Sequence, residues 1–430
     1  MKVLVAPLDW GLGHATRCVP VVREFLRAGA EVELAVVKAN ANFFREVFPE
    51  LRQRLAPSYN IVYPKHGYNM ALWLLKNSMH LNSVMRYEHH FAEEMVDRHG
   101  YDVLFSDNRF AFFSKRAYSI YMTHQRRIAF PRAFAAFERI GVMWHANIMR
   151  KFDEVWVPDL EIYPGYAGSL SHSGATPGDK PMRYVGTLSR FSDWDAGENA
   201  GNALGSALGN VPAPVDLERD VDLMTVSEFM AHSANVEWNA ASEERASGKQ
   251  TFGMRALGLR ALGLRAAYKV VAVVSGVEPA RTQFEQQLRE ALQQIPGQHM
   301  MILGKPSAEQ KTWTEGNIEF HTHLATNDFA EAVKRADFVV SRGGYSTVMD
   351  MAELGAKCIF VPTPGQFEQI VLAHDLSKAG YAVEIPADEL SAETLTSAFE
   401  KSVKMPKVAK QNLLHDAVED VVRKFKERSI

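Results

Sequence analysis

One segment in the second half of the chain restricts the possible folds most strongly. An apolar run at residues 338–340 is followed by Arg342 and the glycine pair Gly343–Gly344, then by a helical pattern, and a second apolar run begins at Cys358. This order predicts a strand, a tight turn, a helix and a parallel strand, whose two polar loops open at the same sheet edge. Such an edge favours phosphorylated ligands, because a helix N-terminus offers free N–H groups and a partial positive charge.

The same alternation of strand and helix patterns runs through most of the chain. The first series has strand patterns at residues 3–6, 32–37, 101–106, 118–122 and 154–157, with a helix at 15–27. The second series has strand patterns at 270–274, 299–303, 317–320, 338–340 and 358–361, with helices at 282–294, 329–334, 346–354 and 368–378. Two α/β halves, each a doubly wound parallel sheet, are the simplest interpretation. A last helical pattern occupies residues 407–426.

Composition is that of an ordinary globular protein. The chain has 430 residues, 47% hydrophobic and 23% charged, and a formal net charge of −3, so it is no general polyanion binder. Its two cysteines, Cys18 and Cys358, make a disulfide framework improbable and favour a reducing cytoplasm. Asp9 cuts short the apolar start that could suggest a signal peptide, and no run approaches the ~20 apolar residues that cross a bilayer. Any membrane contact is therefore expected to be peripheral.

Composition also divides the chain into four parts. We expect a first α/β domain at 1–188, an insertion at 189–267, a second α/β domain at 268–405 and a final helix at 406–430. The insertion is rich in Gly, Ala and Asn and repeats L-G-L-R-A twice at 257–266, which is too short for a repeat architecture. We interpret it as a mobile segment between domains, with a docking arm or lid as the alternative.

A second glycine-rich turn follows the first strand. Residues 9–17 read D-W-G-L-G-H-A-T-R, where Gly11 and Gly13 allow a tight turn close to a ligand and His14 falls at the mouth of the next helix. The alternative for His14 is a capping or packed histidine. Asp107 follows the strand at 101–106 and should open at the same sheet edge as His14, although it is equally suited to an N-cap. Asp9 is a competing carboxylate.

These two segments together resemble one family. The G-L-G-H-A-T-R turn and the segment S-R-G-G-Y-S-T-V-M-D-M-A-E-L-G-A-K-C-I-F-V-P-T-P-G-Q-F-E-Q at 341–369 resemble the MurG-like glycosyltransferases of family 28. The resemblance covers both halves of the chain but not its middle. It implies the GT-B fold, in which two Rossmann-like domains face each other across a cleft, and a last helix that returns to the first domain. It further implies that a sugar is transferred with inversion from a nucleotide sugar, and that this donor is UDP-linked. It implies no cofactor and no metal.

The resemblance also implies the residue roles at the first turn. His14 would take a proton from the acceptor hydroxyl, since a histidine has a suitable pKa near neutrality, and Asp107 would hold its tautomer. The donor diphosphate would lie against the glycine turns and nearby polar groups, which are Gly11, Gly13, Ser275, Gly276, Arg342, Gly343 and Gly344. The family's extra glycines are absent near Ser275, and Arg342 could instead brace its loop.

Other positions match the family's nucleoside and sugar contacts. Asp350 stands where the family carries a glutamate on the ribose hydroxyls, and His323 and Leu324 follow a strand where the family holds the nucleobase. Glu368 and Gln369 match the polar pair that binds the donor sugar; the asparagine that follows in the family is replaced by Leu372, so the sugar preference is open. A metal pair of His321 and His323 is the alternative, but no third ligand has suitable spacing.

The acceptor side is least defined by sequence. Residues 69–91 are apolar and aromatic, and residues 109–151 contain nine basic residues, one acidic residue and interleaved phenylalanines. Core aromatics under a solvated basic face are one interpretation; a surface for anionic lipid headgroups or a polyprenyl-phosphate acceptor is the other. No nucleic-acid reader motif is present, so nucleic acid is not expected as a partner.

Two other functions remain open from the sequence. A nucleotide-sugar epimerase would share the GT-B architecture but release an epimer or free sugar without an acceptor. A nucleotide-sugar-binding protein without turnover would need no base at His14. The sequence does not identify the sugar, the nucleotide, the acceptor or the oligomeric state. We expect a cytoplasmic protein, with a peripheral position at the inner face of the membrane as an extension of the lipid-acceptor hypothesis.

Overall fold

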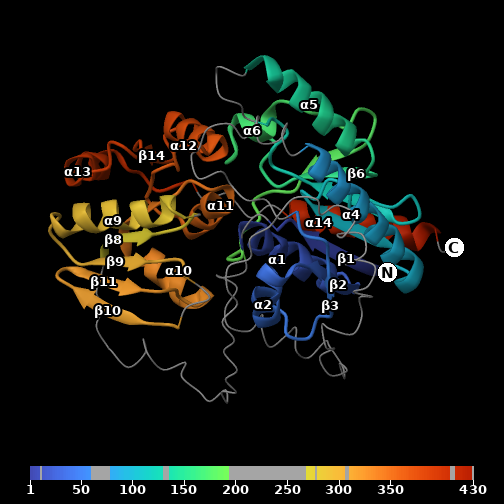
Figure 1. Cartoon of the computed structure of the whole chain (residues 1–430), viewed down its shortest axis with the longest axis horizontal. Coiled ribbons are helices and arrows are strands. Elements are labelled where there is room, and N and C mark those ends of the chain that lie inside the picture. The colour runs from blue at the N-terminus through green and yellow to red at the C-terminus, as the bar shows by residue number, and fades with distance from the viewer. Residues whose placement is uncertain are drawn as a thin grey trace. The chain divides into compact units, whose positions relative to one another are not determined.

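Two parallel-dominated sheets form the framework of the chain (Figure 1). The structure is a computed structural model that describes residues 1–9, 12–59, 78–128, 135–192, 268–276, 278–305, 309–406 and 412–428. The insertion predicted at 189–267 lies almost wholly outside the described residues, as do Gly11 and Arg132. The doubly wound α/β arrangement predicted from sequence is confirmed, whereas the four predicted domain boundaries stay predictions.

The first sheet has seven strands within the described ranges, in the order β3-β2-β1-β4-β5-β6-β7, and all pair in parallel. Its strands are β1 (Lys2–Pro7), β2 (Glu31–Val36), β3 (Gln53–Leu55), β4 (Val103–Asp107), β5 (Tyr118–Met122), β6 (Glu154–Val157) and β7 (Met182–Tyr184). The associated helices are α1 (Leu12–Arg27), α2 (Lys38–Val47), α4 (Ser78–His99), α5 (Ala135–Met149) and α6 (Ser169–His172).

The second sheet, again counted over described residues, has the order β10-β11-β9-β8-β12-β13-β14, with only the β10–β11 pair antiparallel. Its strands are β8 (Tyr268–Val273), β9 (His299–Ile302), β10 (Thr312–Glu315), β11 (Ile318–His321), β12 (Ala336–Ser341), β13 (Cys358–Phe360) and β14 (Val383–Glu384). Its helices are α9 (Ala280–Gln293), α10 (Thr326–Lys334), α11 (Tyr345–Leu354), α12 (Phe367–Lys378) and α13 (Ala392–Lys401).

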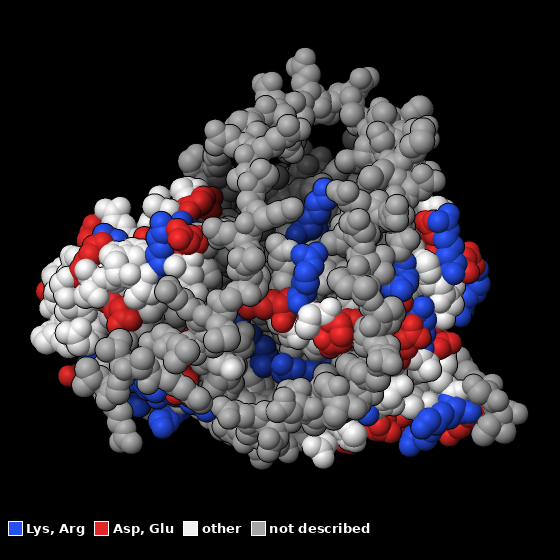
Figure 2. Space-filling view, turned by 90° about the horizontal axis from the view of Figure 1, so that it is seen from below, with Lys and Arg blue, Asp and Glu red and all other residues white. Residues whose placement is uncertain are grey.

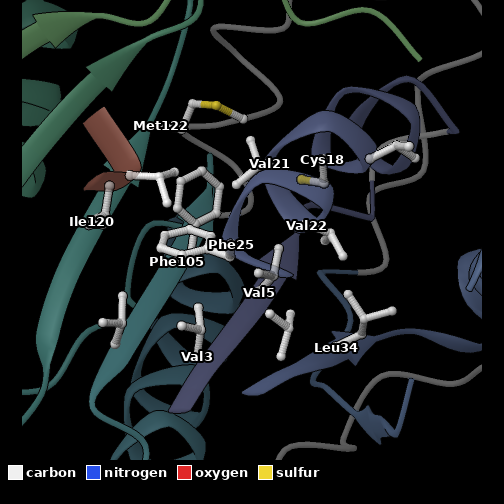
Figure 3. Packing of buried hydrophobic residues seen from close by; sticks show 14 of the residues in the cluster. Val3, Val5, Cys18, Val21, Val22, Phe25, Leu34, Phe105, Ile120 and Met122 are labelled. Atoms are coloured by element: carbon white, nitrogen blue, oxygen red, sulfur yellow. The ribbon is translucent and has the colours of Figure 1, made fainter. Parts of the chain in front are cut away.

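Alternating side chains of β1 build an apolar layer on each face of the first sheet. Val3 and Val5 pack with α1 on one face, and Leu4 and Ala6 pack with α4 on the other. In the first layer Phe25 of α1 points at the sheet (Figure 3), where its ring lies 6.3 Å from those of Phe105 and Trp156. This packing fixes α1, and with it the first turn that carries His14, at the carboxyl end of β1.

The last helix, α14 (Leu413–Arg428), packs on the first sheet's domain. Its Val418 and Val421 are buried in the same apolar layer as Phe25. Polar contacts reinforce the position, since Arg183 donates to Asp420 over 2.9 Å and Lys424 donates to Glu154 over 3.1 Å. The chain therefore returns to its first half after completing the second sheet.

The two faces of the second sheet are covered by different helices. Val271 and Val339 face α10, α11 and α12, while Val270 and Val340 face α9 and α13. Phe191, near the start of the insertion predicted at 189–267, is buried on the α10–α12 side and stacks on Phe329 at 6.0 Å. Residues from the first half thus complete the apolar core of the second.

Candidate functional site

Both glycine turns lie beside the switch point of their sheet, where the order in which strands are added reverses. The chain runs from β1 to β2 on one side and later to β4 on the other, and it leaves β8 in the same way for β9 and β12. Ligands of open α/β sheets bind at the carboxyl ends of strands at such switch points. His14 lies in the first turn of α1 after β1, and Asp107 is the last residue of β4. Ser275 and Arg342 follow β8 and β12 in the same way.

His14 and Asp107 are in hydrogen-bond contact. The Nδ1 atom of His14 is 2.9 Å from Oδ2 of Asp107, whose side chain is fully buried. Burial alone would raise the pKa of Asp107, but the charge of Arg17 and the contact with His14 outweigh it, so the pKa is lowered and the carboxylate is ionised. The pairing predicted from sequence is therefore present in the geometry. Its catalytic role stays a prediction.

Arg17 is a third member of this group, and sequence reasoning gave it no role. Its Nε donates to Asp107 over 2.8 Å, and its Nη2 lies 2.6 Å from Nδ1 of His14. A carboxylate can only accept and a guanidinium can only donate, so the two neighbours favour opposite tautomers of His14. The tautomer with Nδ1–H toward Asp107 leaves the lone pair on Nε2. Burial and the charge of Arg17 lower the pKa of His14 despite Asp107, which favours the neutral imidazole.

The same arginine connects the first sheet to the second. Its Nη1 donates to Nδ1 of His124 over 3.0 Å, so the proton of His124 lies on Nε2, which donates to Oε1 of Glu368 over 3.2 Å. Gln125 donates to the other oxygen of Glu368. The His124 ring stacks on Tyr345 of α11, with centroids 3.9 Å apart and planes within 16°. We call His14, Asp107, Arg17, His124 and Glu368 the central cluster.

The two glycine turns also touch directly. Ser346 in the first turn of α11 donates to the carbonyl oxygen of Gly13 over 2.7 Å. A Cβ atom at Gly13 would lie 2.9 Å from Oγ of Ser346, so it would displace this hydroxyl from its present position. Gly13 was predicted to face the diphosphate; in this structure its carbonyl faces the second half of the chain. Gly11, predicted beside it, lies outside the described residues.

The glycines of the second half differ in the space around them. Gly276 has φ of +110° and open space around a Cβ atom, and Gly344 at the N-cap of α11 is also open. Gly343 is closer to its surroundings, since a Cβ atom there would lie 3.4 Å from Phe360. Open backbone at Gly344 and Gly276, with the N-terminus of α11, is compatible with a phosphate contact. The contribution of Ser275 beside them stays a prediction.

Arg342 is held inside its loop. Its guanidinium donates to the carbonyl oxygens of Val361, Pro362 and Ala280 and lies 3.9 Å from the centroid of the Phe284 ring. Burial lowers its pKa to about 10. These contacts favour the bracing role over the predicted neutralisation of the diphosphate, because both Nη atoms already donate to backbone carbonyls.

Asp350 already has partners for both oxygens. Ser189 donates to its Oδ1 over 2.7 Å, and Arg190 donates to its Oδ2 over 3.1 Å. A ribose that binds this carboxylate would therefore also contact Ser189 and Arg190, which connect the two halves of the chain. The nucleobase positions lie after β11: His323 contacts the hydroxyl of Thr322 over 3.4 Å, and Leu324 packs against the apolar core. Their predicted contacts with a nucleotide stay predictions.

The two predicted sugar ligands point to different partners. Glu368 belongs to the central cluster, whereas Gln369 accepts from the backbone N–H of Thr363 over 2.8 Å and donates to Gln366. Asp9, the competing carboxylate, accepts from Ser58 and from the backbone N–H of Tyr59. Within the described ranges Asp9 is thus bound to the segment after β3, and the partner of His14 is Asp107.

Buried polar atoms without partners gather around the carboxyl edge of the second sheet. Over the described residues, these include the hydroxyls of Ser341, Tyr345 and Thr363 and Nε of Arg342. An unpaired buried polar group costs about 1–3 kcal/mol. A polar ligand at this edge would offer such atoms partners. Among the same residues, no group of three or more His, Cys, Asp or Glu side chains is placed to hold a metal ion.

Simple rules could have found the missed members of the central cluster. Arg17 lies three residues after His14 on the same helix, so both occupy one face. His124 and Gln125 follow β5 directly, as Asp107 ends β4, and the rule that selected Asp107 applies to them as well. The stacking of His124 on Tyr345 had no signal in the sequence, because it joins two sheets.

The structure places partners beside several arginines of the stretch at 109–151, and the lipid-surface interpretation stays a prediction. Arg109 pairs with Glu88 in the interior and Arg126 donates to the carbonyls of Ser171 and Ala175, while nearer the surface Arg116 pairs with Glu93 and Asp97, and Arg127 with Glu138. On the face shown in Figure 2, basic and acidic residues are interspersed. No described helix is long and apolar enough to span a bilayer.

Sequence comparisons match the second half of the chain to a known domain. Residues 270–425 match the glycosyltransferase family 28 C-terminal domain. The chain is 30% identical over 157 residues to the UDP-N-acetylglucosamine–N-acetylmuramyl-(pentapeptide) pyrophosphoryl-undecaprenol N-acetylglucosamine transferase of Chromohalobacter salexigens, covering 34% of this chain and 43% of that protein. The enzyme of the same name in Pasteurella multocida is 42% identical over 74 residues, or 17% of this chain and 21% of that protein. The chain thus spans less than half the length of these curated relatives.

Solved structures extend the similarity to the whole fold. The glycosyltransferase of kitacinnamycin superposes with a TM-score of 0.54 at 12% identity, covering 99% of this chain and 95% of that one. MurG of Acinetobacter baumannii superposes with a TM-score of 0.52 at 13% identity, covering 98% of this chain and 99% of that one. At such low identities these matches establish the fold, which is GT-B.

Proposed function

We propose that this chain, whose residues 270–425 match the glycosyltransferase family 28 C-terminal domain and whose fold is GT-B, is an inverting glycosyltransferase. The donor is a nucleotide sugar, UDP-linked by analogy with the relatives, and the transferred group is a hexose or N-acetylhexosamine. The acceptor is a hydroxyl group, on a lipid-linked or cell-envelope glycan. No metal takes part in this proposal, since backbone donors and helix N-termini would meet the charge of the leaving diphosphate.

The residues of the central cluster divide the chemistry between the two sheets. Nε2 of His14 takes the proton of the acceptor hydroxyl as its oxygen bonds to the anomeric carbon, and Asp107 holds Nδ1–H of the imidazolium that forms. The bond between the anomeric carbon and the diphosphate oxygen breaks in the same step, its electron pair leaves with the nucleoside diphosphate, and the configuration inverts. Glu368 and Gln369 would bind hydroxyls of the donor sugar.

One observation supports this proposal most directly. The base from the first sheet and the sugar ligand from the second, which come from two separate sequence segments, belong to one hydrogen-bonded chain through Arg17 and His124. A transferase needs these two elements together, because the acceptor proton and the donor carbon react in one step. A nucleotide-sugar-binding protein without turnover would have no use for a partly buried histidine paired with a buried carboxylate at this position.

The function can be tested with a panel of UDP-, GDP- and dTDP-sugars. We expect nucleotide release from a UDP-sugar only when a cell-envelope lipid extract is added, with the rate unchanged by EDTA and with inverted configuration in the product. Nucleotide release or epimer formation without an acceptor would support the epimerase alternative instead. Tight binding of the sugar nucleotide without release under any condition would support a binding protein without turnover. No binding of any sugar nucleotide would refute all three functions.

A lipid acceptor implies a surface that meets the membrane, and α5 offers one. Ile140 and Met143 are 62% and 67% exposed, and Arg139 in the same helix and Arg150 directly after it are exposed as well. Exposed apolar side chains flanked by arginines are typical of helices that lie on anionic bilayers. We propose peripheral contact of this face with anionic lipid.

Replacing both apolar residues tests this contact. We expect I140S/M143S to bind phosphatidylglycerol vesicles about tenfold more weakly than the unaltered protein, because two inserted apolar side chains are lost. Binding should also fall with salt, since each arginine contributes about 1 kcal/mol at low ionic strength. Co-sedimentation measures both effects. The control is V403S, at an exposed valine far along the chain; equal binding to neutral phosphatidylcholine vesicles would contradict the electrostatic part.

A further inference from the structure

The charges around His14 do not balance within the first sheet alone. The ionisable groups that interact with it are Arg17 of α1, Asp107 of β4, His124 after β5 and Glu368 of α12, while Cys18 of α1 and Tyr345 of α11 interact in turn with Arg17 and Asp107. Burial raises the pKa values of Cys18 and Tyr345, and His124 is kept neutral by burial. The charged members are therefore Asp107, Arg17 and Glu368.

Arg17 cancels the charge on which a histidine base usually depends. Its Nε lies 2.8 and 2.9 Å from the two oxygens of Asp107, and both side chains are almost fully buried. A proton on His14 would thus face a neutral pair rather than a free carboxylate. In a buried site the effective dielectric constant is low, so this cancellation strongly disfavours the imidazolium.

Glu368 is the remaining negative charge, and it comes from the second sheet. His124 and Gln125 hold its carboxylate, and His124 connects it to Arg17. Burial would raise the pKa of Glu368, but its contact with His124 and the charge of Arg17 outweigh this and lower it, so the group is ionised. With both histidines neutral, the central cluster carries one net negative charge, and one added proton neutralises it.

We propose that Glu368 has a second role besides contact with the donor sugar: through His124 and Arg17, it supplies the uncancelled negative charge that allows His14 to accept the proton of the acceptor. His124 and Arg17 are positioning residues in this scheme. The base in the first half of the chain is therefore a stronger proton acceptor when α12 of the second half is in place. That the proton comes from an acceptor hydroxyl, and that Glu368 also contacts a donor sugar, rests on the proposed function. The effect of the Glu368 charge on the pKa of His14 does not rest on it.

The decisive measurement is an NMR titration of the ligand-free protein with labelled histidine. Glu368→Gln removes the charge and keeps the size of the side chain, and we expect it to lower the pKa of His14 by about 0.5–1. Arg17→Met removes the opposite charge and should raise the pKa of His14. If Arg17→Met fails to fold, Arg17→Lys tests the effect of this charge instead. It keeps the positive charge, so we expect little change in the pKa of His14. His14→Gln assigns the signal.

Two further variants define the route and the background. Glu400→Gln makes the same chemical change at an exposed residue of α13 and should leave the pKa of His14 unaltered. In a His124→Phe background, the effect of Glu368→Gln should fall to half or less, because the connection to Arg17 is lost. An unchanged or raised pKa of His14 in Glu368→Gln would overturn the proposal.

Turnover provides a separate readout. With less negative charge nearby, His14 stays neutral to lower pH, so the acid limb of kcat/KM in Glu368→Gln should move to lower pH while the plateau rate falls. In Arg17→Met the acid limb should move to higher pH. A loss of structure would not shift the two variants in opposite directions. If the NMR shifts occur but no sugar is transferred, the proposed function fails and this inference stands; transfer without the shifts gives the reverse result.

Discussion

His14→Ala is expected to lower kcat of sugar transfer by about 10²- to 10⁴-fold, the usual contribution of a positioned general base. The imidazole contacts Asp107 and Arg17, and no described residue hydrogen-bonds its Nε2. Its removal takes away the proton acceptor and leaves the second sheet unchanged. Donor affinity should therefore remain within about threefold, so the loss would appear in kcat rather than in the Kd of the sugar nucleotide.

Steady-state transfer and isothermal titration with the donor separate these effects. His90→Ala provides a matched control, since it removes an exposed imidazole from α4 and should leave both quantities unchanged. Asp107→Asn should keep the shape of the site but lose the carboxylate that receives Nδ1–H, and its kcat should also fall. Full activity in His14→Ala would mean that another group takes the proton.

The framework of both sheets follows from local patterns. The strands predicted at 118–122 and 154–157 agree at both ends with β5 and β6, because buried parallel strands are continuous apolar runs with polar flanks. The edge strands β3, β7, β10 and β14 were not predicted. They have two to four residues each, too few for a period of two to be distinctive. These segments are strands because they hydrogen-bond to an adjacent strand, and that pairing is not visible in the local sequence.

The site was predictable to the extent that strand ends identify it. His14, Asp107 and Glu368 were selected because each follows or ends a strand–turn pattern, and the structure brings them into one cluster. Arg17 and His124, the links between them, were missed. Their importance depends on how the two sheets approach each other, and the residues they join lie up to 244 positions apart in sequence. Hydrophobic periodicity reports local structure, so it carries no information on contacts between residues this far apart in the sequence.

Charge composition was the least reliable guide. A basic stretch suggests an anion-binding surface only if its side chains reach solvent, and sequence alone does not show where the compensating carboxylates lie. Arg109 illustrates the problem, because its partner Glu88 belongs to a helix that begins at Ser78, in a segment interpreted as an acceptor surface. Both side chains are fully buried. The pair is therefore a structural element of the first domain.

Glu88→Ala is expected to reduce the free energy of unfolding by about 3–5 kcal/mol, the cost of breaking a buried ion pair. Glu88 accepts from Nε of Arg109 over 2.6 Å, from the hydroxyl of Tyr59 over 2.5 Å and from the backbone N–H of Ala111 over 2.8 Å. The alanine variant leaves a buried cation and two buried donors without this acceptor. Since domains are stable by about 5–15 kcal/mol, urea denaturation should show a large loss.

Two comparisons separate the buried charge from the loss of helix packing. Glu94→Ala, in the same helix, breaks an exposed pair with Arg98 and should cost less than about 1 kcal/mol. The double variant E88M/R109M removes both charges together and should be more stable than Glu88→Ala, because no uncompensated guanidinium remains buried. If Glu88→Ala and Glu94→Ala were equally mild, Arg109 would have to reach solvent in the unaltered protein. A basic surface at this position would then be restored as an interpretation of residues 109–151.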